Sequence, residues 1–245
     1  MDRPRDGIPR QPPAPLVFHT HRNDDQWTWA IAVAVTSALG RELEHKPRAR
    51  LLVSGGTTPA PVFRALSQAP LDWARIDIAL VDERWLRPDD PDSNAHLVRE
   101  HLLRGHALEA RFETLTRPGR SIEAAVADAN LHARHPPGIV LLGMGDDGHV
   151  ASLFPHMRGL DAALDSDNAY VAVDASGCPG AGPWNQRISL TPAGLAPAHT
   201  RLLLLRGTEK RVVFERALEG GDPREMPVRI AFNTPGATLQ VHWCP

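Results

Sequence analysis

The stretch that decides the fold is residues 140–155, which read Val-Leu-Leu-Gly-Met-Gly-Asp-Asp-Gly-His-Val-Ala-Ser-Leu-Phe-Pro. Residues 139–142 are apolar at every position, the pattern of a parallel strand buried on both faces. Three glycines then let the backbone turn sharply and approach a ligand. We expect a helix to start at Ala151 and Ser152. His149 should therefore lie in a loop at the carboxyl edge of a sheet, where open α/β folds bind ligands.

His149 has two interpretations on this stretch alone. A histidine near a helix start often only caps the helix or faces solvent, and glycines after a strand often only turn the chain. The run Asp-Asp-Gly-His among glycines favours a catalytic base, but short motifs of this kind also occur by chance. The choice between the two depends on the rest of the chain.

Strand and helix patterns alternate on both sides of this stretch. Short apolar runs predict the strands, and capping residues and proline positions predict the helix ends. Because parallel strands need helix-sized connections, the alternation predicts an α/β fold, with three αβα layers around a mainly parallel, Rossmann-like sheet. The expected strands are residues 16–19, 49–53, 76–81, 139–142, 170–173, 187–190 and 201–205, and the expected helices are residues 23–44, 59–67, 94–103, 121–133 and 208–218.

The composition is that of one globular domain. The chain has 245 residues, 42% of them hydrophobic, which is enough for one large α/β core. Residues 1–15 carry five prolines and three arginines and few side chains that could pack. We expect that segment to be disordered and residues 16–245 to form a single α/β catalytic domain.

Charge and cysteine usage exclude several classes of partner. The formal net charge is −2, which gives no basic field for nucleic acid or an anionic membrane. Cys178 and Cys244 have neither metal-ligand nor disulfide-framework spacing. No stretch has the length and apolarity of a signal peptide or a membrane span. We therefore expect a cytoplasmic protein without nucleic-acid, membrane or metal partners.

A glycine turn at residues 54–59, Ser-Gly-Gly-Thr-Thr-Pro, joins a predicted strand to a predicted helix. Its glycines expose backbone N–H groups, and the positive end of the helix dipole behind them favours a bound anion such as phosphate. No lysine follows the glycines, so this is not a P-loop, and an ordinary strand-to-helix turn remains the alternative. The candidate phosphate ligands here are Ser54, Gly55, Gly56, Thr57 and Thr58.

A polar group, Asp82-Glu83-Arg84-Trp85, follows the predicted strand 76–81 and reaches the same edge of a parallel sheet. The planar guanidinium of Arg84 could clamp a phosphate, and Asp82 or Glu83 could orient a sugar hydroxyl, a water or Arg84 itself. The alternative is a solvated ion pair. Adjacent side chains on a strand point to opposite faces, so the two carboxylates cannot flank one bond as in a glycosidase.

Three segments occur in a characteristic order, and together they resemble the 6-phosphogluconolactonase family. The likeness extends from about residue 16 to the C-terminus. The segments that carry it are residues 54–59, residues 82–85 with 92–94 after them, and residues 143–155, followed by residues 187–191 and 202–210.

The resemblance implies hydrolysis of 6-phospho-D-glucono-1,5-lactone to 6-phosphogluconate in the oxidative pentose phosphate pathway, with no metal or organic cofactor. It implies a fold similar to glucosamine-6-phosphate deaminase and ribose-5-phosphate isomerase. We expect a monomer or weak homodimer. By matching positions, His149 is implied to be the general base, with Asp147 orienting it. The implied substrate or phosphate contacts are the loop 54–58, Arg84, Asp82, Gly145, Arg187 and Lys210.

The chemistry of a lactone agrees with these residue types. A lactone is an activated ester, so an enzyme needs a base to activate water, a site for the oxyanion at C1, and firm anchoring of the phosphate. Imidazoles ionise near neutral pH, which suits the role of base. The backbone N–H groups of residues 143–145 are candidate oxyanion donors.

One segment departs from the family pattern. Many members carry Lys-Pro-Pro just before the arginine strand, where this chain reads Gly-Pro-Trp-Asn-Gln at residues 182–186. A lysine contact is therefore missing there. Arg187 and Lys210 are the candidates to replace it.

Two other functions remain as alternatives. A glucosamine-6-phosphate deaminase would share the Asp-Glu and Asp-Gly-His turns, but in that family a tyrosine tends to follow Asp-Glu, where this chain has Arg84 and Trp85. A non-catalytic sugar-phosphate sensor would need a DNA-reading module, and the short arginine- and proline-rich N-terminus is no helix-turn-helix.

Overall fold

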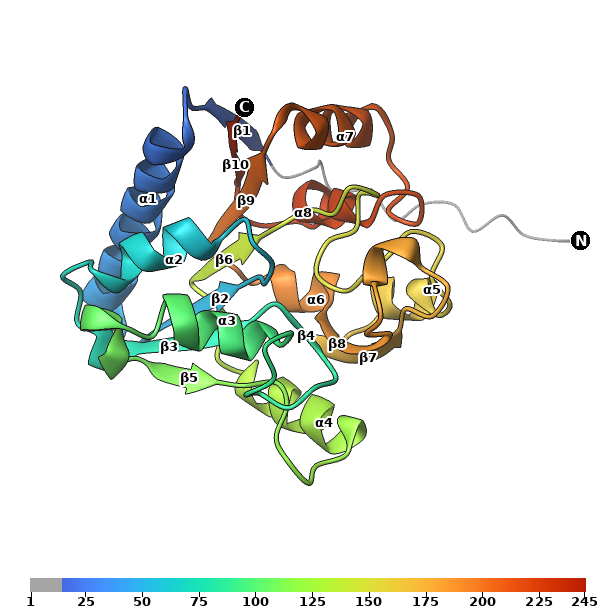
Figure 1. The fold of residues 1–245 in the computed structure, drawn as a ribbon, viewed down its shortest axis with the longest axis horizontal. Coiled ribbons are helices and arrows are strands. Elements are labelled where there is room, and N and C mark those ends of the chain that lie inside the picture. Colours follow the sequence, from blue (N-terminus) through green and yellow to red (C-terminus); the bar gives the residue numbers. More distant parts are fainter. Residues whose placement is uncertain (1–14) are drawn as a thin grey trace, which may run out of the picture.

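The computed structural model describes residues 15–245 of the chain (Figure 1). The segment expected to be disordered, residues 1–15, lies outside the described residues except for Pro15. The carbonyl oxygen of Pro15 accepts a hydrogen bond from the N–H of Leu239 at 2.9 Å. The first strand begins at Leu16, as the sequence predicts.

Within residues 15–245 the chain forms ten strands and eight α-helices, in an alternating order. The strands are β1 (Leu16–Thr20), β2 (Ala49–Val53), β3 (Ile76–Leu80), β4 (Asp82–Arg84), β5 (Arg111–Glu113), β6 (Ile139–Leu142), β7 (Tyr170–Asp174), β8 (Gln186–Leu190), β9 (Thr200–Arg206) and β10 (Leu239–Cys244). The helices are α1 (Asp24–His45), α2 (Ala60–Ser67), α3 (Asn94–His101), α4 (Ile122–His132), α5 (Leu160–Leu164), α6 (Pro192–Leu195), α7 (Thr208–Glu219) and α8 (Ile230–Asn233).

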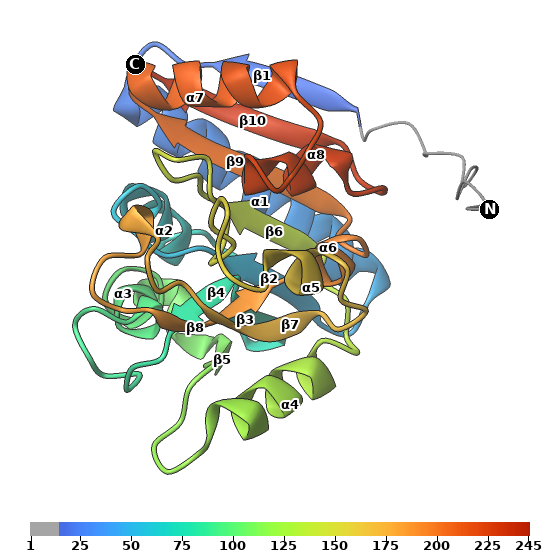
Figure 2. The same cartoon turned by 90° about the vertical axis from the view of Figure 1, so that its right-hand side faces the viewer.

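Seven strands form one parallel sheet in the order β1-β10-β9-β6-β2-β3-β5. Figure 2 shows these strands stacked across the molecule. In Figure 1, α1, α2 and α3 lie on one side of the sheet and α6, α7 and α8 on the other, which gives the predicted three layers. Because helices cover both faces, central strands such as β2 and β6 are buried along their whole length.

Helix α1 illustrates how the sequence sets these elements. The side chain of Asn23 caps it by accepting the Gln26 N–H at 2.9 Å. Trp27, Ile31 and Val35 recur every four residues and are completely buried against the sheet. No helix in residues 15–245 is long and apolar enough to cross a membrane.

The predicted strands at residues 170–173 and 187–190 do not join the parallel sheet. They form β7 and β8, which pair with β4 in a separate antiparallel sheet, β4-β8-β7. Their connection, residues 175–185, contains only a 3₁₀ turn at Pro179–Ala181. It lacks the helix that a parallel crossover needs, so the two strands pair antiparallel.

The helix expected to begin at Ala151 and Ser152 is absent, and that prediction was wrong. Residues 145–157 form successive turns, and the next helix is α5. Ala151 has a positive φ of 52°, which a helix does not allow. The N–H of Ser152 donates to Ser189 Oγ on β8 at 3.1 Å, so this turn is fastened to the small sheet.

Candidate active site

A cavity of about 350 Å³ opens at the carboxyl ends of β2 and β6, beside β4 and β8. Every predicted site residue except Asp147 lines it, so the structure brings together segments from the whole length of the chain. The lining residues are Ser54, Gly55, Gly56, Thr57, Thr58, Asp82, Arg84, Asn94, Gly143, Met144, Gly145, Asp146, His149, Ala151, Arg187 and Lys210.

Ser54 joins the two loops that follow β2 and β6. Its hydroxyl donates to the Leu141 carbonyl at 3.0 Å and accepts the N–H of Gly143 at 3.3 Å. The residue is only 8% exposed. Its hydroxyl proton is therefore already used within the protein, and Ser54 contributes to the cavity chiefly by fixing the loop that carries its neighbours.

Residues 55–58 present the free donors of that loop. Their N–H groups donate to no backbone carbonyl within residues 15–245, and they lie just before the N-terminus of α2. Gly56 has a φ of +88°, which favours glycine. A Cβ on Gly55 would fall 1.8 Å from the Asn94 side chain, so only glycine lets the two loops approach this closely. The arrangement is that of an anion-binding helix start.

His149 and Asp147 form a tightly bonded pair at the other side of the cavity. Asp147 Oδ1 lies 2.6 Å from His149 Nδ1 and also accepts the His149 N–H at 3.0 Å. Burial raises the pKa of Asp147, but its hydrogen bonds and charge interaction with His149 outweigh this and leave the pKa below its ordinary value. With Nδ1–H donated to Asp147, Nε2 of the ring is left as the proton acceptor.

Two glycines leave room for this pair. A Cβ on Gly145 would lie 2.0 Å from His149 Nδ1, and a Cβ on Gly180 would lie 2.6 Å from Asp147 Oδ2. Gly145 was predicted as a substrate contact, and its N–H instead donates to the His149 carbonyl at 2.9 Å. Gly180 was not predicted as a site residue, although the abundance of glycine and proline around it was a signal.

Asp82 belongs to a buried chain of hydrogen bonds at the floor of the cavity. Its Oδ2 accepts the hydroxyl of Ser152 at 2.6 Å, and Ser152 Oγ accepts Arg187 Nη1 at 3.3 Å. Asn94 Nδ2 donates to the Asp82 carbonyl at 2.8 Å. Ser152 and Asn94 were not predicted as site residues, and both hold Asp82 in a fixed position.

Glu83 points away from Asp82, as expected for neighbours on a strand, and anchors the start of α3. Its carboxylate accepts the N–H groups of Arg84, Asn94 and Ala95 at 2.8–2.9 Å. Burial raises the pKa of Glu83 to about 7, against the lowering effect of these hydrogen bonds. The residue is completely buried, so its role is to position β4 and α3.

Three cationic side chains line the cavity. Arg84 Nη1 donates to the Asp92 carbonyl at 2.5 Å, and Lys210 Nζ lies 2.7 Å from both the Met144 carbonyl and Asp146 Oδ1. Arg187 is only 5% exposed, and burial lowers the pKa of its guanidinium. Asp82 and Asp146 line the same cavity and offset part of this charge, so its lining carries only a small excess of positive charge.

Within residues 15–245, no three His, Cys, Asp or Glu side chains are grouped so that they could hold a metal ion.

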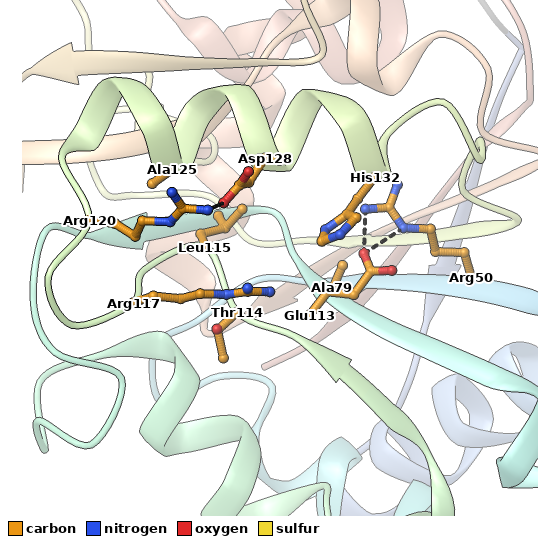
Figure 3. Close-up of a pocket in the computed structure, with 11 residues that line it drawn as sticks. Arg50, Ala79, Glu113, Thr114, Leu115, Arg117, Arg120, Ala125, Asp128 and His132 are labelled. Atoms are coloured by element: carbon orange, nitrogen blue, oxygen red, sulfur yellow. Dashed lines mark hydrogen bonds and ion pairs between the residues drawn. The ribbon is translucent and has the colours of Figure 1, made fainter.

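A second hollow, between β5 and α4, is lined by charged side chains (Figure 3). Its free volume is only about 10 Å³, roughly the room of one water. In Figure 3, Arg50 is paired with Glu113 and Arg120 with Asp128. It is therefore no candidate for a substrate site.

The fold and cavity define a class: a Rossmann-like α/β protein with an anion-binding turn facing an acid–histidine pair. The chain belongs to the family of glucosamine-6-phosphate isomerases/6-phosphogluconolactonase, because the sequence model of that family matches residues 22–243. It is 53% identical over 225 residues to a 6-phosphogluconolactonase from Xylella fastidiosa strain Temecula1, covering 90% of this chain and 94% of that protein.

Solved structures agree with this membership. The crystal structure of a 6-phosphogluconolactonase from Shewanella baltica OS155 matches with a TM-score of 0.88 and 33% identity, covering 94% of this chain and 98% of that one. A monomeric glucosamine-6-phosphate deaminase matches with a TM-score of 0.73 over 92% of this chain and 97% of its own. At 18% identity the deaminase shares the fold alone.

Proposed function

We propose that this chain hydrolyses 6-phospho-D-glucono-1,5-lactone to 6-phospho-D-gluconate, with His149 as the general base. The observation that carries the proposal is the Asp147–His149 pair, whose ring lines the same cavity as the free N–H groups of residues 55–58 and the cations Arg84 and Lys210. The family and the 53% identity to a lactonase support the same reaction.

The phosphate end of the substrate is assigned to the turn before α2. Residues 55–58 supply backbone N–H donors and two threonine hydroxyls, and the helix dipole adds partial positive charge. Arg84 supplies a planar guanidinium to the same anion. Anchoring the phosphate holds the lactone carbonyl near His149 and removes much of the entropy cost of reaction.

The reaction consists of the attack of water on C1, cleavage of the ring C–O bond and two proton transfers. His149 Nε2 takes a proton from water as the water oxygen attacks C1, which gives a tetrahedral intermediate with negative charge on the former carbonyl oxygen. Asp147, held at 2.6 Å, stabilises the imidazolium that forms. The imidazolium then returns its proton to the ring oxygen as the bond from that oxygen to C1 breaks. The products are a carboxylic acid and a free hydroxyl, which balances the addition of one water.

The backbone N–H groups of residues 143–145 differ in whether they are free to donate to an oxyanion. The N–H of Gly143 donates to Ser54 Oγ, and that of Gly145 donates to the His149 carbonyl. The Met144 N–H has no backbone acceptor within residues 15–245, and Met144 lines the cavity. We assign the oxyanion contact to the Met144 N–H, with Lys210 beside it as a cation.

The remaining proposals concern the protein as a whole. We propose that residues 16–245 act as a single domain, as a monomer or weak homodimer in the cytoplasm, without nucleic acid as a partner. Both cysteines are free thiols, a state typical of that compartment. The continuous seven-stranded sheet supports the single domain.

Purified protein tests the reaction class directly. We expect it to accelerate loss of the lactone well above the spontaneous rate and to release no ammonia from glucosamine-6-phosphate. Ammonia release without lactone turnover would support the deaminase alternative. Binding of 6-phosphogluconate with no turnover of either substrate would support the sensor alternative.

A further inference from the structure

The loop between β7 and β8, residues 175–185, is bonded to the segment between β4 and α3, residues 85–93. The indole Nε1 of Trp184 donates to Asp92 Oδ2 at 3.1 Å. The two strands beside this contact are also paired, because the Trp85 N–H donates to the Gln186 carbonyl at 2.8 Å. Trp184 therefore lies where the two segments meet, next to the cavity.

Asp92 is in turn the partner of Arg84. Its backbone carbonyl accepts Arg84 Nη1 at 2.5 Å, whereas Arg84 Nε is buried and has no partner within residues 15–245. Among residues 15–245, the Asp92 carbonyl is therefore the hydrogen-bond acceptor that fixes the Arg84 guanidinium. The orientation of Arg84 in the cavity consequently depends on where the Asp92 peptide lies.

Trp184 is itself firmly held. Its carbonyl accepts Arg187 Nε at 2.8 Å, and Arg187 Nη2 also donates to the Ala181 carbonyl at 2.5 Å. Arg187 is buried on β8, and its guanidinium lies 5.2 Å from the ring centre of Phe154. The indole N–H thus extends from a residue whose carbonyl is held by Arg187 to the exposed carboxylate of Asp92.

We propose that Trp184 is a positioning residue that holds Arg84 toward the phosphate of the substrate, acting through Asp92. The proposal rests on the proposed function for the identity of the substrate, but its geometry concerns only the anion-binding end of the cavity. Without the indole N–H, the Asp92 side chain loses its bond to the loop 175–185, and the carbonyl that accepts Arg84 is held less firmly. An unfixed arginine must be ordered again each time an anion binds, which weakens binding and leaves proton transfer at His149 unchanged.

The variant Trp184→Phe keeps an aromatic ring and removes the donor. We expect KM for the lactone to rise about 3- to 10-fold, the cost of immobilising one long side chain, with kcat within about twofold. Asp92→Ala removes the acceptor and should have the same effect, whereas Asp92→Asn keeps an acceptor oxygen and should restore KM to near the wild-type value. Trp29→Phe, at an exposed tryptophan on α1, is the matched control and should change neither constant.

Binding of inorganic phosphate, measured by titration calorimetry, gives a readout that needs no turnover. The Kd should rise in Trp184→Phe by the same factor as KM, and in an Arg84→Ala background the second change should add nothing. Unchanged phosphate affinity in both Trp184→Phe and Asp92→Ala, or a fall in kcat at constant KM, would overturn the proposal. If the wild-type protein fails to hydrolyse the lactone, the proposed function fails, and the phosphate titrations still decide the role of Trp184.

Discussion

At the scale of single residues, the acid–histidine pair depends on glycines as much as on its own side chains. Gly145 and Gly180 each leave space that a Cβ would fill, one against His149 and one against Asp147. The sequence predicts His149, Asp147 and Gly145 because they share one contiguous motif. Gly180 reaches the pair from a loop 33 residues further along the chain than Asp147, so no local pattern connects them.

Gly145→Ala tests this dependence. The added methyl must displace the His149 ring, from which the ideal Cβ position is only 2.0 Å away at Nδ1. A misplacement of about 1 Å can cost about 10²-fold in rate, so we expect kcat to fall by about that factor. Steady-state kinetics on the lactone measure the effect.

Gly221→Ala is the matched control, because a Cβ at Gly221 meets nothing within 4 Å and the residue lies outside the cavity. It should retain wild-type kinetics. Equal activity in Gly145→Ala and Gly221→Ala would show that the position of the imidazole is not what the glycine protects.

At the scale of elements, the long helices and the apolar strands were predicted well, whereas the short helices α5, α6 and α8 and the strands β5 and β10 were not predicted. The bounds of α1, β2 and β6 agree with the sequence within a residue or so, because capping and continuous apolar runs mark them. Strand β10 was missed, since Gln240 and His242 interrupt its apolar pattern, yet it lies between β1 and β9. These two polar side chains lie between strands β1 and β9, and that position follows from the tertiary structure and not from the local sequence pattern.

His242 on β10 makes stability depend on pH. It is only 4% exposed, and its Nδ1 lies 3.1 Å from Nε2 of His21. Burial, with smaller contributions from the charges of His19 and His21, lowers its pKa from 6.5 to about 3. The unfolded chain therefore binds a proton that the folded chain does not between about pH 6.5 and pH 3, so this contribution to stability is lost as the pH falls through that range.

Between about pH 7 and pH 5, the free energy of unfolding should fall by about 2 kcal/mol on account of this one group. Urea titrations at the two pH values measure it. His242→Asn should remove most of this dependence, whereas His135→Asn, at an exposed histidine, should retain it. Burial of Glu83 acts in the opposite direction over this range, so the decisive comparison is between the two proteins: a His242→Asn variant with the same pH dependence as wild type contradicts the assignment.

At the scale of the whole molecule, the sequence predicts which residues gather but not how each is used. Parallel strands end at one edge, so the loops after β2 and β6 and the residues after β3 were expected to meet, and one cavity contains them all. The antiparallel sheet β4-β8-β7 was not expected, and it carries the network of Asp82, Ser152 and Arg187. Such networks depend on tertiary pairing that periodicity does not encode.

The same limit applies to the departure at residues 182–186. The sequence indicates only that a lysine contact is missing, with Arg187 and Lys210 as replacements. Both line the cavity, but the donors of Arg187 are largely engaged with Ser152, Ala181 and Trp184. These bonds hold the loop 175–185 against β8, and the spacing of residues in the sequence does not predict them.

The role of His149 in activating water is tested by the kcat of His149→Ala on the lactone, corrected for spontaneous hydrolysis. General base catalysis contributes about 10²- to 10⁴-fold, so kcat should fall by a factor in that range while inorganic phosphate still binds with wild-type affinity. Turnover within about threefold of wild type would contradict this role of His149, because another group would then have to take the proton from water.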